Sequence, residues 1–292
     1  MKHIVIYNDK INNKAFDDLY AFMKQTFESQ NYDYELIASE SCTHTAEIIN
    51  QQQTPCRLYI CGGDGTLHNC IKNIIHSQHE LVLLPFGTGN DFSRMLVDQK
   101  DAKAHFSNSF KQKAQLIDVM KINDTYGINT ACFGFDADIA NHVHEIDLPF
   151  SPRSLIYLIT ALKRVFAYKS NQVCIKVDGK VWYEGKIFFA TINNGKYYGG
   201  GYKFTPKASV NDGILDLFII KDFKRIKVLY KIFPILIQKP WILKDTITTS
   251  GKCIEVISKQ GVNIDGETYS DKTFKIEAIT NALRFVNAFI NE

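Results

Sequence analysis

The chain has 292 residues, of which 45% are hydrophobic and 22% are charged, and its formal net charge is +3. This composition is typical of a soluble globular protein with one large or two medium domains, and the small net charge gives no reason to expect nucleic acid as a partner. The seven cysteines show no C-x-x-C spacing, and no apolar run reaches the roughly 18 residues that suggest a membrane span. We therefore expect a cytoplasmic protein without a transmembrane segment, in contact with a membrane only peripherally.

Strand-like and helix-like segments alternate in the first part of the chain. The expected strands are residues 3–7, 34–38, 57–61 and 81–85, and the expected helices between them are 14–28, 45–52 and 67–76. Such alternation with short connections favours a mostly parallel sheet covered by helices on both faces, with ligands at the carboxyl ends of the strands. We predict an N-terminal α/β nucleotide-binding domain over residues 1–120, with residues 281–292 as a candidate segment that completes it.

Two glycine-rich loops follow the third and fourth expected strands. The first, Gly62 to Thr66, leads into a helix, where glycine permits close backbone approach and the helix N-terminus offers N–H groups to phosphate oxygens. A carboxylate such as Asp64 would repel phosphate unless a cation lies between them, which indicates a Mg-nucleotide. The chain contains neither a P-loop nor a Rossmann fingerprint. A tight turn without any ligand remains the alternative for this loop.

The second loop, Gly87 to Asp91, follows a strand that neighbours the first loop's strand. Thr88 and Asn90 could hydrogen-bond a nucleotide, and Asp91 adds a second carboxylate for a metal ion or a donor group. The alternative is a glycine turn in which Asn90 or Asp91 caps a helix. The pairing of the two loops at one edge of the sheet favours nucleotide binding.

Short strands dominate from about residue 115 onward. The expected strands are residues 115–122, 126–133, 172–177, 186–193, 213–220, 252–258 and 273–278, with turns at Asp178-Gly179, Asp212-Gly213 and Asp265-Gly266. This pattern predicts an antiparallel β-sandwich domain over residues 121–280. Two helices, at 154–167 and 223–238, interrupt it. The second mixes lysines with aromatic residues, which fits either a segment at an anionic lipid surface or a solvated face over a packed one.

Several ordered motifs together resemble the diacylglycerol kinase catalytic family. They are Gly62-Gly63-Asp64-Gly65-Thr66, Pro85-x-Gly87-Thr88-x-Asn90-Asp91-Phe92-x-Arg94, Gly134-Phe135-Asp136-Ala137, the run from Asn193-Asn194-Gly195 to Gly199-Gly200-Gly201, Asp212-Gly213 and Asp265-Gly266-Glu267. The resemblance spans nearly the whole chain. The family includes bacterial lipid kinases and sphingosine and ceramide kinases, and its nucleotide domain is related to that of NAD kinases. It implies an α/β nucleotide domain followed by a β-sandwich domain, with the active site in the cleft between them.

The resemblance also implies roles for individual residues, with ATP and Mg²⁺ as cofactors. Glu267 would accept the proton of the lipid hydroxyl, and Asp64 and Asp91 would serve the charge and metal side of catalysis. The nucleotide would contact Asn8, Lys10, Asn12, Ser39, Gly62, Gly63, Asp64, Gly65, Thr66, Leu67, His68, Thr88 and Asn90. A second Mg²⁺ would bind the Asp212 side chain and the backbone carbonyls of Ser209 and Ile214, where the alternative is an ordinary turn.

The chain departs from the family pattern in its first loop. The family usually has Asn-Pro-x-Ser-Gly, whereas this chain has Asn8-Asp9-Lys10-Ile11-Asn12. Lys10 could replace backbone donors with a charge, and Ser39 stands where the family has a threonine after the second strand.

The sequence thus predicts an ATP- and Mg-dependent lipid kinase at the inner face of the membrane, with diacylglycerol as the preferred acceptor and phosphatidic acid as the product. The alternatives are an NAD kinase-like enzyme and a catalytically silent protein that binds nucleotide or lipid. A homodimer is a candidate assembly.

Overall fold

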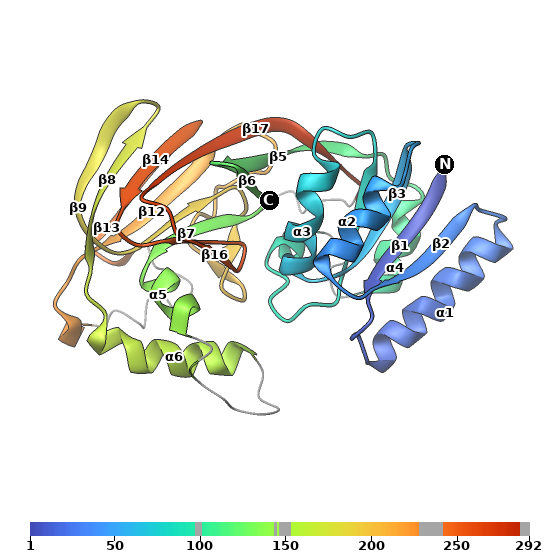
Figure 1. Cartoon of the computed structure of the whole chain (residues 1–292), viewed down its shortest axis with the longest axis horizontal. Coiled ribbons are helices and arrows are strands. Elements are labelled where there is room, and N and C mark those ends of the chain that lie inside the picture. The colour runs from blue at the N-terminus through green and yellow to red at the C-terminus, as the bar shows by residue number, and fades with distance from the viewer. Residues whose placement is uncertain (97–100, 143–144, 146–152, 228–241, 287–292) are drawn as a thin grey trace. The chain divides into compact units, whose positions relative to one another are not determined.

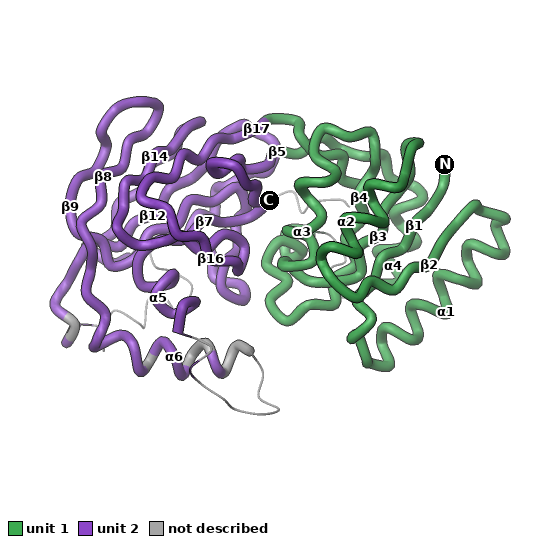
Figure 2. Tube along the Cα trace, viewed as in Figure 1, with its two compact units in different colours: residues 1–118, 280–292 green, residues 119–279 purple. Residues whose placement is uncertain are grey.

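The computed structural model describes residues 1–292 except 97–100, 143–144, 146–152, 228–241 and 287–292 (Figure 1). The chain divides into two compact units (Figure 2). Unit 1 comprises Met1–Asp118 and Thr280–Glu292, and unit 2 comprises Val119–Ile279. The chain passes between the units within two strands, β5 (Gln115–Ile122) and β17 (Thr273–Phe285).

Unit 1 contains a parallel sheet in the order β17-β4-β3-β1-β2. Its strands other than β17 are β1 (Lys2–Asn8), β2 (Tyr34–Ser39), β3 (Cys56–Gly62) and β4 (Glu80–Pro85). All four were expected from the sequence within a residue or two at each end. Their near-continuous apolar runs are typical of strands that are buried on both faces.

Helices cover both faces of this sheet. They are α1 (Lys14–Ser29), α2 (Cys42–Asn50), α3 (Asp64–Ile74) and α4 (Ala102–Ser109), with a 3-10 turn η1 (Phe92–Met95). Helices α1 and α4 share one apolar cluster with Val5, Tyr59 and Val82 of the strands. Helices α2 and α3 lie against each other. The parallel α/β architecture predicted from the alternating pattern is confirmed.

Unit 2 is built from antiparallel strand pairs in the order β16-β15-β7-β9-β8-β14-β17, and β12 pairs with β9 and β13. Its strands other than β5 and β17 are β6 (Thr125–Gly127), β7 (Thr130–Gly134), β8 (Asn171–Val177), β9 (Lys180–Asn193), β10 (Tyr197–Tyr198), β11 (Tyr202–Lys203), β12 (Leu215–Lys221), β13 (Thr246–Gly251), β14 (Cys253–Ser258), β15 (Val262–Ile264) and β16 (Glu267–Tyr269). The predicted β-sandwich-like second domain is confirmed.

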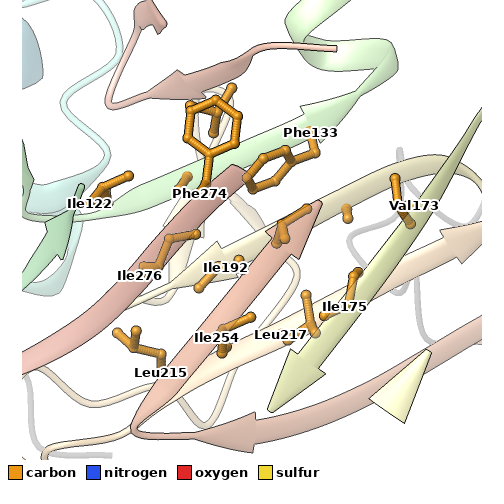
Figure 3. Packing of buried hydrophobic residues seen from close by; sticks show 14 of the residues in the cluster. Ile122, Phe133, Val173, Ile175, Ile192, Leu215, Leu217, Ile254, Phe274 and Ile276 are labelled. Carbon is orange, nitrogen blue, oxygen red and sulfur yellow. The ribbon is translucent and has the colours of Figure 1, made fainter. Parts of the chain in front are cut away.

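An apolar cluster fills unit 2 between its strands (Figure 3). Phe133 of β7 and Phe274 of β17 meet edge to face with ring centroids 5.4 Å apart. A second cluster lies beside helix α6 (Arg153–Ala167), in which Val165 packs with Phe188 and Phe218. Helix α6 therefore contributes to an apolar cluster that also contains residues of β9 and β12, and the short helix α5 (Phe135–His142) contacts α6.

Several expectations about elements need correction. Helix α3 begins at Asp64 rather than at residue 67, because Gly63 is its N-cap and the glycine motif itself forms the first turn. The expected strand 126–133 is two strands, since the backbone N–H groups of Ile128 and Asn129 bind the Asp265 carboxylate. The pattern also missed α4, α5, β10, β11, β13, β15 and β16, and it found only parts of β9 and β17.

The helix expected at 223–238 lies largely outside the described residues, where only a 3-10 turn, η3 (Arg225–Lys227), is present before residue 228. Within the part of the chain that the structure describes, no helix is both long and apolar enough to cross a bilayer.

Candidate active site

Four loops of unit 1 leave the carboxyl ends of neighbouring parallel strands. Strand β3 lies between β1 and β4, and Gly62 at its end is aligned with Pro85 at the end of β4. The N–H of Phe86 donates to the carbonyl of Gly62 over 2.9 Å. The two glycine-rich loops therefore start side by side, as the sequence predicts, at the edge where open α/β sheets bind their ligands.

Close approach of the two loops explains two of the glycines. A Cβ atom added at Gly63 would lie 2.8 Å from the Cα of Gly87, and one added at Gly87 would meet Gly63 and the Asn90 side chain. Distances of this kind force the backbone of one loop to shift. Gly63 and Gly87 are thus required by the packing of loop against loop, whether or not a ligand is present.

Asp64 joins the two loops through its carboxylate. Oδ2 accepts the N–H of Asp91 over 2.9 Å, and Oδ1 accepts the N–H of Phe92 over 3.0 Å. The acid also stands in the first turn of α3, where the helix dipole favours a negative charge. In the sequence, Asp64 indicates a metal ion near phosphate. The structure gives it a second reason, since it caps the η1 turn of the neighbouring loop.

Asn90 holds the second loop in shape. Its backbone has φ +51°, its Oδ1 accepts the N–H of Gly87 over 2.9 Å, and its Nδ2 donates to the Gly87 carbonyl over 2.7 Å. The amide therefore binds within the glycine turn, and it does not cap η1, whose N-cap position is Asp91. Thr88 is exposed at the loop tip. Asp91 is buried, and its Oδ1 lies 3.4 Å from the Nε of Arg94.

The first loop's other residues differ in what they present. The Leu67 side chain is fully buried and its N–H donates to the Gly63 carbonyl, so it supports the helix start. His68 is buried as well. Gly65 is the opposite case, because a Cβ added there would meet no heavy atom within 4 Å. The N–H groups of Gly65 and Thr66 precede the hydrogen-bond ladder of α3 and point toward its N-terminus, which suits an anion.

The loop after β1 exposes Asn8, Lys10 and Asn12. The Asn8 Oδ1 accepts the N–H of Lys10 over 2.8 Å, which shapes the loop as an Asx turn. Ser39, at the end of β2, is buried. Its Oγ donates to the Ser41 carbonyl over 2.9 Å and lies 2.6 Å from the Thr45 Oγ1, so its hydroxyl binds the start of α2.

Glu267 begins β16 directly after a tight turn in unit 2. Asp265 and Gly266 have φ +49° and +103°, and Ile264 is paired with Glu267 across the hairpin. Such values belong to a two-residue hairpin turn, so the expected turn is confirmed. Glu267 is exposed. Its backbone position is restrained by Asp265, whose carboxylate accepts the N–H groups of Ile128, Asn129 and Thr130 over 2.7, 3.0 and 2.8 Å.

The three residues proposed for a second metal lie in the turn before β12. The Asp212 Oδ1 accepts the N–H of Ile214 over 3.0 Å, and the Ser209 Oγ donates to the Asn211 side chain over 2.7 Å. Burial, with a smaller contribution from Asp212, raises the pKa of Asp216 to about 6. Carboxyl and carbonyl oxygens of this kind suit a hard cation. Among the described residues no cluster of three or more His, Cys, Asp or Glu side chains could hold a metal ion.

Three polar residues of unit 2 received no role from the sequence. Asp136 is 4% exposed and accepts hydrogen bonds from the Tyr198 hydroxyl and from the Asn263 amide. Asn263 is 6% exposed and also binds the Gly266 N–H. Asp136 belongs to one of the recognised motifs, which was a signal of its importance. Its partners lie far along the chain. Tyr198 falls inside the recognised run from Asn193 to Gly201, whereas no local pattern marks Asn263.

Comparison with known proteins identifies two domains. Residues 2–122 match the family described as the diacylglycerol kinase catalytic domain, and residues 129–287 match the YegS C-terminal NAD kinase beta sandwich-like domain. A "probable lipid kinase YegS-like" protein of Cronobacter sakazakii is 31% identical over 230 residues, which cover 76% of this chain and 75% of that protein. A protein of the same description from Alcanivorax borkumensis is 29% identical over 231 residues, 76% of each chain.

Solved structures agree on the fold. A diacylglycerol kinase from Bacillus anthracis has a TM-score of 0.72 at 23% identity and covers 98% of this chain and 96% of its own. An NAD kinase from Archaeoglobus fulgidus in complex with ATP has a TM-score of 0.58 at 15% identity, over 100% of this chain and 94% of its own. At these identities the likeness concerns the arrangement of the elements.

Proposed function

Because this chain belongs to the lipid kinase family that combines a diacylglycerol kinase catalytic domain with a YegS C-terminal domain, we propose that it transfers the γ-phosphoryl group of ATP to a lipid hydroxyl. Diacylglycerol is the acceptor we favour, which would make phosphatidic acid the product.

The pair of glycine loops in unit 1 carries this proposal. Asp64 fastens the second loop to the first turn of α3 through two backbone hydrogen bonds. Beside it, Gly65 leaves open space where any side chain would stand. A helix N-terminus with free room in front of it suits the phosphates of a nucleotide, because first-turn N–H groups and the helix dipole both favour anionic oxygens.

Glu267 is the proposed general base. Its side chain is exposed on a turn whose backbone is restrained, so it can meet an acceptor that approaches from solvent or from a lipid surface. In the proposed step Glu267 takes the proton of the lipid hydroxyl while the hydroxyl oxygen forms a bond to the γ-phosphorus. The bond between that phosphorus and the bridging oxygen breaks, and ADP leaves with the electron pair.

Mg²⁺ is the proposed metal. Bound to the phosphates of ATP, it would supply the positive charge that phosphoryl transfer needs. Asp91, a buried carboxylate of the second loop, would orient a ligand at that loop. In unit 2, Asp212 with the carbonyls of Ser209 and Ile214 would hold a second ion, because turn oxygens of this type match a hard cation.

A transfer assay with several acceptors tests the function. The protein is incubated with radiolabelled ATP and Mg²⁺, and with diacylglycerol micelles, a total lipid extract or NAD in parallel. We expect label in the lipid arms, and we expect Glu267→Gln to lower kcat by about 10²- to 10⁴-fold, the usual range for a general base. Label in NAD alone would establish an NAD kinase. ATP binding without label in any arm would establish a silent binding protein.

We further propose that a surface around α6 and η3 meets the lipid. Two large apolar side chains are exposed there, Phe166 at 58% and Ile226 at 66%, and η3 lies against α6. Lys163, one turn before Phe166, and Lys224 and Lys227 around Ile226 are also exposed. Apolar side chains among lysines match an interface with anionic headgroups, where each lysine contributes about 1 kcal/mol.

Vesicle binding tests this surface. The double variant Phe166→Ser and Ile226→Ser should lower cosedimentation with phosphatidylglycerol vesicles at least about threefold. It removes both apolar side chains that would be buried in the lipid. The matched control is Val181→Ser with Ile257→Ser, which removes two exposed apolar side chains elsewhere on unit 2. Equal loss in both double variants would contradict the proposed surface.

A further inference from the structure

A buried acid stands behind the turn that carries Glu267. Asp136 lies in the first turn of α5, a helix that contacts both β15 and β16. It is 4% exposed, and its two carboxylate oxygens have different partners. Oδ1 accepts the hydroxyl of Tyr198 from β10, and Oδ2 accepts the Nδ2 of Asn263 from β15 over 2.8 Å. A buried carboxylate is tolerated because hydrogen bonds and the helix N-terminus both compensate its charge.

Asp136 determines which way the Asn263 amide points. A carboxylate only accepts hydrogen bonds, so the NH₂ group of Asn263 must face it. The amide oxygen is then directed to the other side, where it accepts the N–H of Gly266 over 3.0 Å. Gly266, which this bond holds, is the residue directly before Glu267. The orientation of one buried amide thus links α5 to the backbone of the catalytic turn.

The turn is held from a second direction by Asp265. Its carboxylate binds the backbone at the start of β7, and its own N–H donates to the Thr130 carbonyl over 3.0 Å. Gly266 has φ +103°, which other residues rarely adopt, and a Cβ there would meet nothing within 4 Å. Hydrogen bonds rather than side-chain packing therefore restrain this peptide, and the one that the Gly266 N–H donates to Asn263 Oδ1 ties it directly to the buried amide.

We propose that Asp136 and Asn263 are positioning residues for Glu267, acting through the Gly266 peptide. The proposal rests on the proposed function, in which Glu267 is the general base. An exposed side chain can serve as a base only if its backbone is held near the productive geometry, because a displacement of about 1 Å can cost about 10²-fold in rate. The network restrains the backbone of Glu267 and leaves its carboxylate accessible.

A double-mutant cycle separates this role from a general effect on stability. Asn263→Ala and Glu267→Gln are made singly and together in the full chain, and kcat and the KM for ATP are measured with diacylglycerol micelles. Asn263→Ala should lower kcat at least about 10-fold and leave the KM for ATP unchanged, because the ATP loops belong to unit 1. In the Glu267→Gln background the same change should lower kcat less than about twofold, since the group it positions is already gone.

Asn123→Ala is the matched control. Asn123 is another asparagine of unit 2 whose amide ties backbone together, accepting the Lys275 N–H over 2.9 Å and donating to the Thr273 carbonyl over 3.0 Å. It is half-buried and makes no contact with the Glu267 turn among its described hydrogen bonds. We expect its removal to leave kcat within about twofold of the wild type.

Asp136→Asn provides a second variant if Asn263→Ala does not fold. It keeps the volume of the side chain and can still accept one hydrogen bond, so kcat should fall by less than the roughly 10-fold expected for Asn263→Ala, and only when Glu267 is present. An equal fall of kcat with and without Glu267, or no fall at all, would overturn the positioning role. A wild-type protein that phosphorylates no lipid overturns the proposed function itself, which distinguishes the two failures.

Discussion

One methyl group at Gly65 tests whether the glycine motif holds phosphate. Gly65 lies in the first turn of α3, and its substitution by alanine places a Cβ in open space. Its φ is not in the left-handed region, so alanine suffers no backbone strain. The folded protein alone gives no reason for glycine at this position. A phosphate group that approaches the first-turn N–H groups closely would give one.

Gly65→Ala should affect the stability of the fold and the binding of ATP differently. Alanine is the better helix former by about 0.5–1 kcal/mol, so the free energy of unfolding should stay equal or rise. If phosphate occupies the space, the methyl group should raise the KM for ATP at least about 10-fold, which corresponds to about 1.4 kcal/mol of lost binding. Stability and ATP affinity therefore move in opposite directions.

Gly63→Ala is the matched control, because it adds the same methyl group two residues earlier. Its Cβ would lie 2.8 Å from the Cα of Gly87, and relieving this clash must move one of the loops. Overpacking of this kind costs about 1–3 kcal/mol. We expect the melting temperature to fall in Gly63→Ala and not to fall in Gly65→Ala.

The assay combines thermal unfolding with ATP saturation of the phosphoryl-transfer rate. A Gly65→Ala protein with unchanged KM for ATP would refute the argument that the open space at this helix N-terminus receives phosphate. A Gly65→Ala protein that unfolds more easily would refute the premise that no protein group needs this glycine.

Three further predictions concern the remaining site and the core. Asp64→Ala should lower the free energy of unfolding by about 2–3 kcal/mol, because the backbone N–H groups of Asp91 and Phe92 lose a charged acceptor. Urea denaturation measures this change, and an unchanged midpoint would contradict the role of Asp64 in joining the two loops. Lys10→Ala should raise the KM for ATP, and an unchanged value would remove Lys10 from the nucleotide site. His3 is buried, and burial lowers its pKa from 6.5 to about 4. Between these two pH values the unfolded chain binds a proton at His3 and the folded chain does not, so the free energy of unfolding should fall as the pH drops from about 6.5 to about 4. His3→Phe should flatten this part of the stability curve, and an unchanged acid profile would contradict the assignment.

Local patterns in the sequence predicted most of the fold. The strands β1 to β4 and the helices between them follow from apolar runs and turn residues that act within a few positions of each other. The elements that were missed, α4, α5, β10, β11, β13, β15 and β16, span two to eight residues, so each carries few residues for a period to show. Strand β7 begins only at Thr130 because a carboxylate from Asp265 takes the N–H groups before it.

The candidate site was predictable in position but not in the state of its polar groups. The sequence alone determined which loops end neighbouring strands, and so it placed Asp64, Gly65 and Asn90 at one edge of the sheet, because element order and glycine placement are local properties. Its turn signal also placed Asp265 and Gly266 in the hairpin before Glu267. The role of Glu267 comes from the family resemblance and stays a prediction. Only the tertiary structure decided that Asp64 and Asn90 are bound within their own loops and that Gly65 faces open space. The physical reason is that hydrogen-bond partners and clashes depend on distance in space. The Asn263 amide and the Asp136 carboxylate are 127 positions apart in the chain yet 2.8 Å apart in the fold.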